Sequence, residues 1–164
     1  MHRRSVAVFD RFLSTLATLL DKAEAHCEAR KIRPEVLLTA RLFPDMFPLT
    51  RQVQLACDFA ARSTARLAGQ EPKAFPDTEM SFAELKHRIA AARGYMGSFQ
   101  PADFAHADTR EVHFKAGGHA MVLKGDEFLS FYALPQFFFH LTTAYNILRH
   151  NGVDLGKRDY MGAS

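Results

Sequence analysis

The sequence lacks the features that mark several large classes of protein. It has no tryptophan, no repeat and only two cysteines, Cys27 and Cys57, which lie far apart and form no CxxC pair. Neither a disulfide framework nor a cysteine zinc site is therefore expected, and free thiols favour the reducing cytoplasm. No apolar run reaches the roughly 18 residues that a membrane helix needs. These absences predict a globular cytoplasmic protein that does not cross a membrane.

An excess of charge of one sign is also missing. The chain has 21 Lys and Arg against 18 Asp and Glu, a formal net charge of +3, and no long basic run. Proteins that bind nucleic acid usually carry a clustered basic face, so no nucleic-acid partner is expected. The opening "MHRRSVAVF" resembles a signal peptide, but Asp10 and Arg11 interrupt its apolar stretch and indicate an amphipathic helix instead.

Known catalytic motifs are absent as well. The sequence contains no GxSxG, HExxH or GxGxxG. "GVDLGK" (152–157) is not a phosphate loop, because only three residues separate its glycines and Arg158 follows the lysine.

What the sequence does contain is helical periodicity in four segments. Apolar residues recur at helical spacing over residues 5–30, 48–67, 81–95 and 135–150. Ser81 and Glu84 are spaced for a capping box at the start of the third segment, and Gly69 and Gly152 follow the ends of the second and fourth. On the second segment the inner stripe is formed by small residues, so that a neighbouring helix can approach closely: Val53, Ala56, Cys57, Ala60 and Thr64.

A β-hairpin is predicted between the third and fourth helices. Val112 and Phe114 alternate with polar neighbours, "KAGGHA" offers a glycine turn, and residues 121–123 can pair back. The expected fold is therefore all-α, an antiparallel four-helix bundle with a small β-hairpin insertion before the last helix, in a single domain over residues 1–164. The long connections leave the order of helix directions open.

His140 is the main candidate functional residue. In "PQFFFHLTTAYNILRH" it shares a helical face with Phe137, Ala144 and Ile147, so it should point into the bundle. Three roles remain open: a core residue with a hydrogen-bond partner on another helix, a residue that binds a small molecule or transfers a proton, or a metal ligand. The candidate partners on the second helix are Gln52, Gln54 and Asp58.

Asp58 is the second candidate. A buried carboxylate without a partner is too costly, so Asp58 is either a solvated flank of its helix or accepts across the bundle from His140, Tyr145 or Arg149. If the protein is an enzyme, His140 is the acid/base. The catalytic candidates are His140, Asp58 and Tyr145, and the ligand-binding candidates are Gln54, Gln136 and Arg149.

Two long stretches carry a family resemblance. "RLFPDMFPLTRQVQLACDFA" (41–60) and "PQFFFHLTTAYNILRHNGVDLGKRDYMG" (135–162) resemble the signature stretches of a bacterial domain family of unknown function in the DinB/YfiT-like superfamily of metalloenzymes. The overall spacing also agrees, so the resemblance covers most of the chain. It implies the DinB-like four-helix bundle.

The resemblance also implies a metal site, but the chain departs from its pattern. Relatives place one His on the second helix and an HxxxH pair on the fourth. His140 aligns with the second His of the pair and Gln136 with the first, while Gln52 and Gln54 stand where the third ligand would be. With one ligand of three, a tightly held metal or other cofactor is not expected. A small-ligand-binding or structural bundle is then expected, with a homodimer as the candidate assembly. The alternative is an enzyme of the transferase or hydrolase type, built around His140.

Overall fold

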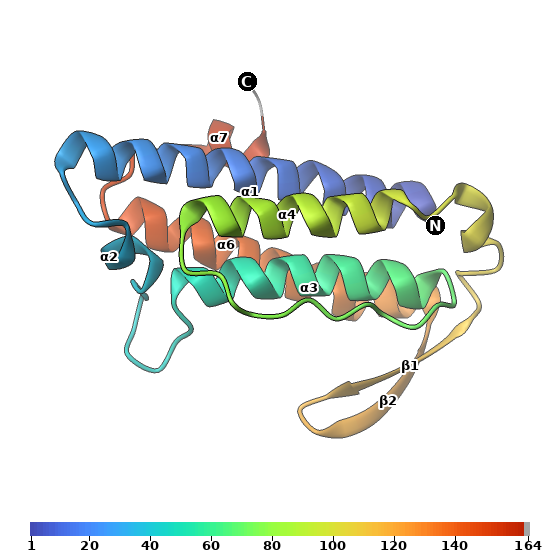
Figure 1. Cartoon of the computed structure of the whole chain (residues 1–164). Helices are drawn as coiled ribbons and strands as arrows, with labels where there is room; N and C mark the ends of the chain where they lie inside the picture. Colours follow the sequence, from blue (N-terminus) through green and yellow to red (C-terminus); the bar gives the residue numbers. More distant parts are fainter. Residues whose placement is uncertain (163–164) are drawn as a thin grey trace.

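Four long helices form the body of the protein (Figure 1). The structure is a computed structural model that describes residues 1–162. The long helices are α1 (His2–Arg30), α3 (Leu49–Leu67), α4 (Phe82–Gly97) and α6 (Leu134–His150). The short elements are α2 (Pro34–Leu38), a 3-10 turn (Pro101–Phe104), β1 (Glu111–Ala116), β2 (His119–Lys124), α5 (Gly125–Glu127), a π-helical turn (Phe128–Ala133) and α7 (Lys157–Met161). The predicted four-helix bundle with a hairpin before the last helix is confirmed.

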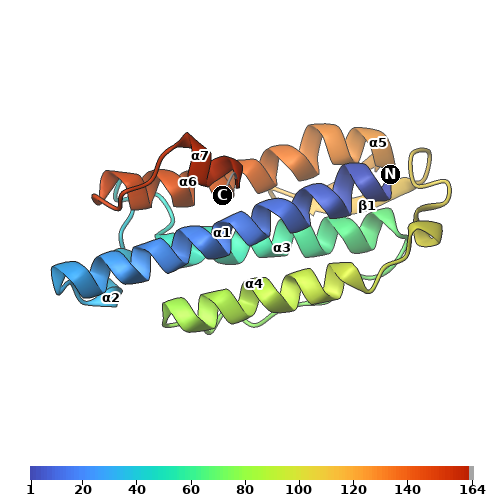
Figure 2. The same cartoon turned by 90° about the horizontal axis from the view of Figure 1, so that it is seen from above.

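The order of the helix directions follows from one long connection. Residues 68–80 leave the end of α3 and run back along the bundle to the start of α4, so α3 and α4 point the same way (Figures 1 and 2). α1 and α6 both run in the opposite direction. α3 packs against both α4 and α6, and α1 packs against α4. We call residues 70–80, which form no helix or strand, the strap.

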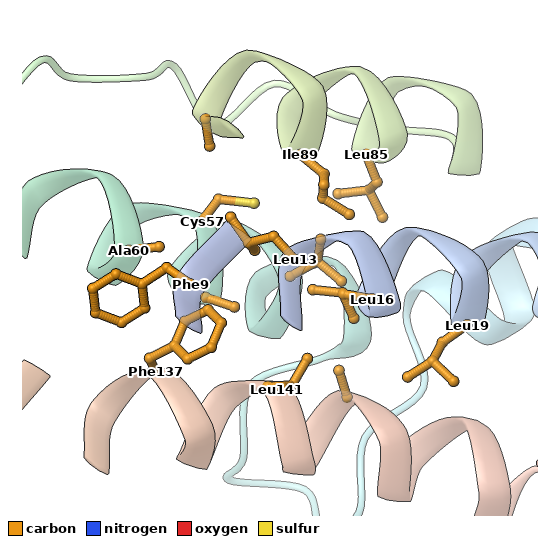
Figure 3. Packing of buried hydrophobic residues seen from close by; sticks show 14 of the residues in the cluster. Phe9, Leu13, Leu16, Leu19, Cys57, Ala60, Leu85, Ile89, Phe137 and Leu141 are labelled. Atoms are coloured by element: carbon orange, nitrogen blue, oxygen red, sulfur yellow. The ribbon is translucent and has the colours of Figure 1, made fainter. Parts of the chain in front are cut away.

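The core is built from the apolar stripes of the four long helices. Phe9, Leu13 and Leu16 of α1 point between the other helices, where they are fully buried (Figure 3). The predicted small-residue stripe of α3 also lies inside, and Ala60 and Cys57 have no exposed surface. Phe137 of α6 meets Phe9 edge to face, with 5.0 Å between the ring centroids. Burying such rings stabilises the bundle by roughly 1.5–3 kcal/mol each.

The hairpin packs against the start of the last helical rod. Phe114 of β1 pairs with Met121 of β2, and the Phe114 ring lies 5.1 Å from that of Phe128. Gly125 opens the rod where only glycine fits, because a Cβ atom there would lie 1.8 Å from the carbonyl oxygen of Ala107.

The last helical rod begins earlier than the sequence predicted. It starts at Gly125 rather than Pro135, and passes through α5 and the π-helical turn before α6. The prediction used Pro135 as a first-turn proline, but the chain is already helical there. Proline has no N–H to donate, and the hydrogen-bonding pattern changes from π to α at this point.

No helix within residues 1–162 combines the length and apolar character that crossing a bilayer requires.

Candidate functional site

His140 lies at the seam between α6 and α3, and its partner is Gln52. The His140 side chain is buried, with 6% of its surface exposed. Its Nδ1 atom lies 2.8 Å from Oε1 of Gln52 on α3. Of the three partners that the sequence left open, the structure therefore selects Gln52. We call His140, Gln52 and the rings around them the histidine site.

The hydrogen bonds of Gln52 fix the tautomer of His140. The Gln52 amide donates from Nε2 to the carbonyl oxygen of Phe47, at 3.1 Å. Its Oε1 is then the atom that faces His140, and because an amide oxygen only accepts, Nδ1 of His140 must carry the proton. Nε2 of the neutral ring is left with a lone pair.

That lone pair has no partner within the described protein. Among residues 1–162, Arg88 Nε is the side-chain nitrogen or oxygen that is fully buried and lacks a hydrogen-bond partner. His140 Nε2 makes no hydrogen bond among these residues either, and since it is not fully buried, a water molecule can touch part of it. The histidine site thus holds one free hydrogen-bond acceptor.

Aromatic rings flank this acceptor. The imidazole stacks on Phe59 of α3 with ring centroids 5.5 Å apart and an angle of 13° between the planes. Phe139 meets it edge-on at 5.2 Å. The imidazole is therefore held between apolar surfaces.

This environment keeps His140 uncharged. Burial, and then the positive charge of Arg51, lower the pKa of His140 from 6.5 to about 4. Arg51 occupies the turn of α3 next to the site, with its guanidinium 6.0 Å from the centre of the Phe47 ring. At neutral pH the ring is a hydrogen-bond acceptor at Nε2 and not a cation.

The residues that the family resemblance places at metal-ligand positions do not fit a tightly held metal. They supply one imidazole and the amides of Gln52 and Gln136, whereas zinc is held by Cys, His and carboxylate ligands. The Gln52 oxygen is occupied by His140 Nδ1. Residues 1–162 also contain no group of three or more His, Cys, Asp and Glu side chains placed to hold a metal ion.

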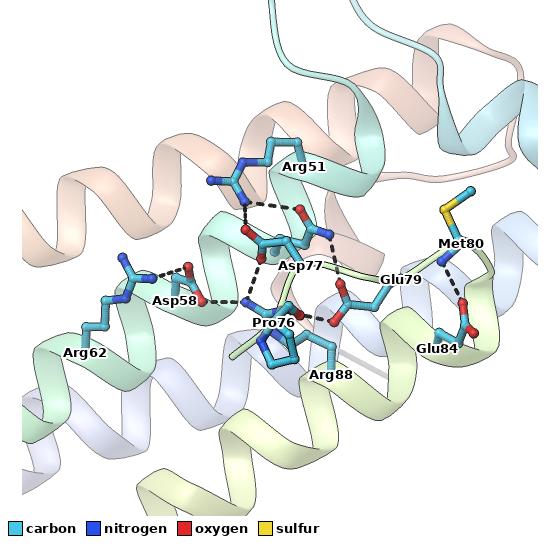
Figure 4. A network of polar contacts seen from close by, with 10 residues as sticks. Arg51, Asp58, Arg62, Pro76, Asp77, Glu79, Met80, Glu84 and Arg88 are labelled. Atoms are coloured by element: carbon cyan, nitrogen blue, oxygen red, sulfur yellow. Dashed lines mark hydrogen bonds and ion pairs between the residues drawn. The ribbon is translucent and has the colours of Figure 1, made fainter. Parts of the chain in front are cut away.

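Asp58 belongs to a different cluster, and both predictions for its surroundings are wrong. It is neither solvated nor paired with His140, Tyr145 or Arg149; it is 3% exposed. Its Oδ1 accepts from Arg88 of α4 at 2.6 Å and its Oδ2 pairs with Arg62 at 2.8 Å (Figure 4). The reason is its position on α3, which faces α4 rather than α6.

Arg88 is the centre of this second cluster. Its guanidinium donates to the Pro76 carbonyl at 2.9 Å, to Glu79 at 3.0 Å and to Asp77 at 3.2 Å, all in the strap. Gln54, a predicted ligand-binding residue, also lies here, since its Nε2 donates to Glu79 at 2.8 Å. We call these residues, with Asp58, the arginine cluster. Its contacts hold the strap against both α3 and α4.

The arginine cluster is electrostatically matched. Burial alone would lower the pKa of Arg88, but the hydrogen bonds and charges of Glu79 and Asp58 outweigh it, so the pKa is raised. A buried guanidinium surrounded by carboxylates is costly to break, because a remaining partner would be left buried and unpaired. The arrangement indicates a structural role for Asp58.

The remaining predicted residues are not brought to His140. Tyr145 is half-buried and meets Tyr160 of α7 edge to face at 5.6 Å, on another side of α6. Arg149 is exposed near the end of α6. Gln136 is partly exposed, one turn before His140.

A groove lined largely by polar residues lies away from His140, between α1, Arg93 of α4 and α7, with a volume of about 560 Å³. Two ion pairs lie within it, Arg93 with Asp10 at 2.7 Å and Lys22 with Asp159.

Two important residues were missed from the sequence. Arg88 lies three residues after Leu85 and four before Ala92, within the buried arc of α4, and a charge in that arc was the signal that could have revealed it. Phe59 was overlooked because it flanks the inner stripe of α3; it is half-buried.

Comparisons with known proteins agree with this fold. The model of the domain of unknown function DUF1993 matches residues 1–161. The crystal structure of a DinB family member protein from Shewanella denitrificans is 44% identical in sequence and superposes with a TM-score of 0.93, covering 99% of this chain and 92% of that one. No curated protein matches the chain.

Proposed function

This chain belongs to the DUF1993 family and has a DinB-like fold, and we propose that it binds a small organic molecule at the histidine site and holds no tightly bound metal there. The observation that carries the proposal is the hydrogen-bonded chain from His140 Nδ1 through Gln52 to the Phe47 carbonyl. It orients the imidazole and leaves Nε2 as a fixed acceptor between aromatic rings.

The geometry favours one class of ligand. An acceptor at Nε2 requires a hydrogen-bond donor, such as a hydroxyl or an N–H group, on the ligand. Phe59 and Phe139 favour an apolar or aromatic body next to that donor, since rings pack edge to face or in offset stacks. Arg51 disfavours a cationic ligand through charge repulsion.

Phenol and toluene form a matched pair of probes, because they differ in the hydroxyl group. In protein with ¹⁵N-labelled histidine, NMR should show His140 protonated at Nδ1 at neutral pH. Phenol should then shift the Nε2 resonance, toluene should leave it unchanged, and His140→Gln should abolish the response. A proton found on Nε2, or equal shifts with phenol and toluene, would refute the proposed acceptor.

The metal part of the proposal has a separate test. Purified without a His-tag, the protein should hold less than one equivalent of zinc or nickel by elemental analysis. The double variant Gln52→His/Gln136→His, which restores the superfamily's donor set, should bind zinc more tightly. One tightly bound transition metal per native chain, lost in His140→Ala, would overturn this part.

The enzymatic alternative, a transferase or hydrolase that uses His140, has weaker support. A general base works best when its pKa lies near the working pH, and that of His140 is about 4. Asp58 and Tyr145 do not contact the imidazole, as described above. An activity whose pH profile has an inflection near 4, removed in His140→Gln, would favour the enzyme.

We also propose a cytoplasmic location, which the two free and buried cysteines, Cys27 and Cys57, support.

A further inference from the structure

Four phenylalanines stand out on the surface of the two segments that meet at the histidine site. Phe43 is 63% exposed, Phe47 54%, Phe131 77% and Phe139 58%. Large apolar side chains scattered singly are ordinary on a protein surface, but a group of them marks an interaction site.

The four rings come from two segments that meet at the histidine site. Phe43 and Phe47 lie in the loop between α2 and α3, and the Phe47 carbonyl accepts from Gln52, which is bonded to His140 of α6. Phe139 touches the His140 ring. Phe131 lies on the same rod, eight residues before Phe139, with the exposed Pro135 midway between them. We call Phe43, Phe47, Phe131, Pro135 and Phe139 the aromatic face.

The area of the aromatic face matches one side of a protein interface. A phenylalanine offers about 200 Å² when fully exposed, so the four exposed fractions amount to about 500 Å² of aromatic surface. A standard interface buries about 800 Å² on each partner, of which about 60% is apolar. The face alone therefore provides the apolar share that a stable pair of proteins needs.

The charges around the face decide which partner fits. The loop carries one exposed residue of each sign, Arg41 and Asp45, between and beside its phenylalanines. Arg51, next to Phe47, is already paired with Asp77 of the strap. A membrane surface or a nucleic acid would attract an excess of positive charge, as juxtamembrane basic clusters show. A patch with both signs can pair with itself about a two-fold axis, where the basic group of one copy meets the acidic group of the other.

We infer that the aromatic face is the contact surface of a homodimer, in which two copies of this chain bury these phenylalanines against each other. This inference does not depend on the proposed ligand. The two proposals share Phe139, whose ring flanks His140, but sedimentation tests the dimer and the Nε2 resonance tests the ligand, so each can fail alone.

Sedimentation velocity over a hundredfold range of concentration tests the inference. The native protein should sediment at about twice its chain mass of 18.5 kDa. The double variant Phe43→Ser/Phe139→Ser should sediment as a monomer, with an unchanged far-ultraviolet circular dichroism spectrum because both rings are exposed. Phe131→Ser, at the other end of the face, should weaken the dimer independently.

Met161→Ser is the matched control. Met161 is also an exposed apolar residue, at 42%, but α7 lies on the opposite side of the bundle from the loop and hairpin (Figure 1). It should leave the dimer intact. A monomeric native protein at every concentration would overturn the inference, as would a dimer that survives in both phenylalanine variants. If the native protein is monomeric and binds vesicles of anionic lipid, the partner of the aromatic face would be a membrane and not a second copy, and the inference would be wrong.

Discussion

Acidification should destabilise this protein through His140. The pKa of this histidine is about 4 in the folded protein and 6.5 in the reference state, so between these pH values the unfolded chain binds a proton that the folded chain does not. The free energy of unfolding therefore falls as the pH is lowered from 6.5 to 4, and the contribution is fully present above 6.5. One pKa unit corresponds to about 1.4 kcal/mol, so the loss should approach about 3 kcal/mol.

The measurement is urea unfolding at intervals between pH 7.5 and pH 4, followed by circular dichroism. Other groups titrate in this range too, so native protein is compared with His140→Gln, whose amide does not titrate and can still donate to Gln52. The difference between the two free energies of unfolding should change by about 3 kcal/mol across the window.

A constant difference between native protein and His140→Gln would refute the reasoning. It would mean that His140 titrates in the folded protein as it does in the unfolded chain, and that the ring is solvated rather than held between Phe59 and Phe139. A difference that grows in the opposite direction, with native protein gaining stability in acid, would indicate a carboxylate partner instead of Gln52.

Three other predictions concern packing and burial. Arg88→Met should lower the free energy of unfolding by about 3–5 kcal/mol, because the buried carboxylates of Asp58 and Glu79 would lose their common cation and keep only Arg62 and Gln54 as partners. Arg93→Met, at a more exposed ion pair, should cost at most about 1 kcal/mol. Equal losses in urea unfolding would contradict the central role of Arg88. Ala60→Leu should lower the free energy of unfolding by about 1–3 kcal/mol through overpacking, whereas Ala90→Leu, on the exposed side of α4, should change it little. An unchanged unfolding midpoint for Ala60→Leu would mean that the small-residue stripe of α3 lies at the surface. Burial raises the pKa of the Cys57 thiol, so iodoacetamide should label Cys57 in urea but not in native buffer, as measured by mass spectrometry. Rapid labelling in native buffer would show that α3 and α4 separate.

The fold could be predicted because it depends on regular patterns. Periods of apolar residues locate the four long helices, and alternation around "KAGGHA" locates the hairpin, since each element has to bury one face. The inward direction of His140 followed from the same rule, and Gln52 was among its proposed partners. These are properties of neighbouring residues in one segment.

The arginine cluster could not be predicted in the same way. Asp58, Arg88 and the strap acids are far apart in the sequence, and they meet only because the strap crosses the full length of the bundle. The predicted helices left the strap residues unassigned, and the sequence offered Asp58 either as a solvated flank of its helix or as a partner of His140, Tyr145 or Arg149. Which side of α3 faces α4 depends on the direction of α4, and the helical patterns left that direction open. Tyr145 and Arg149 were misplaced for a related reason, since helical spacing does not show which neighbour covers each side of α6.

The π-helical turn at Phe128–Ala133 has a consequence for insertions and deletions. A π turn bonds each residue to the fifth one along and so accommodates one residue more than an α-helix would. Deleting that extra residue would let the rod run as a regular α-helix with α6 still on its present side, so the π turn is where the rod tolerates a change of one residue. The same deletion inside α6 would rotate everything before it by about 100° relative to the residues after it. Phe128 would then leave its packing against Phe114, and the hairpin would no longer lie against the bundle. A change of one residue inside α6 would therefore cost more than the same change in the π-helical turn or in the exposed loop at 41–47.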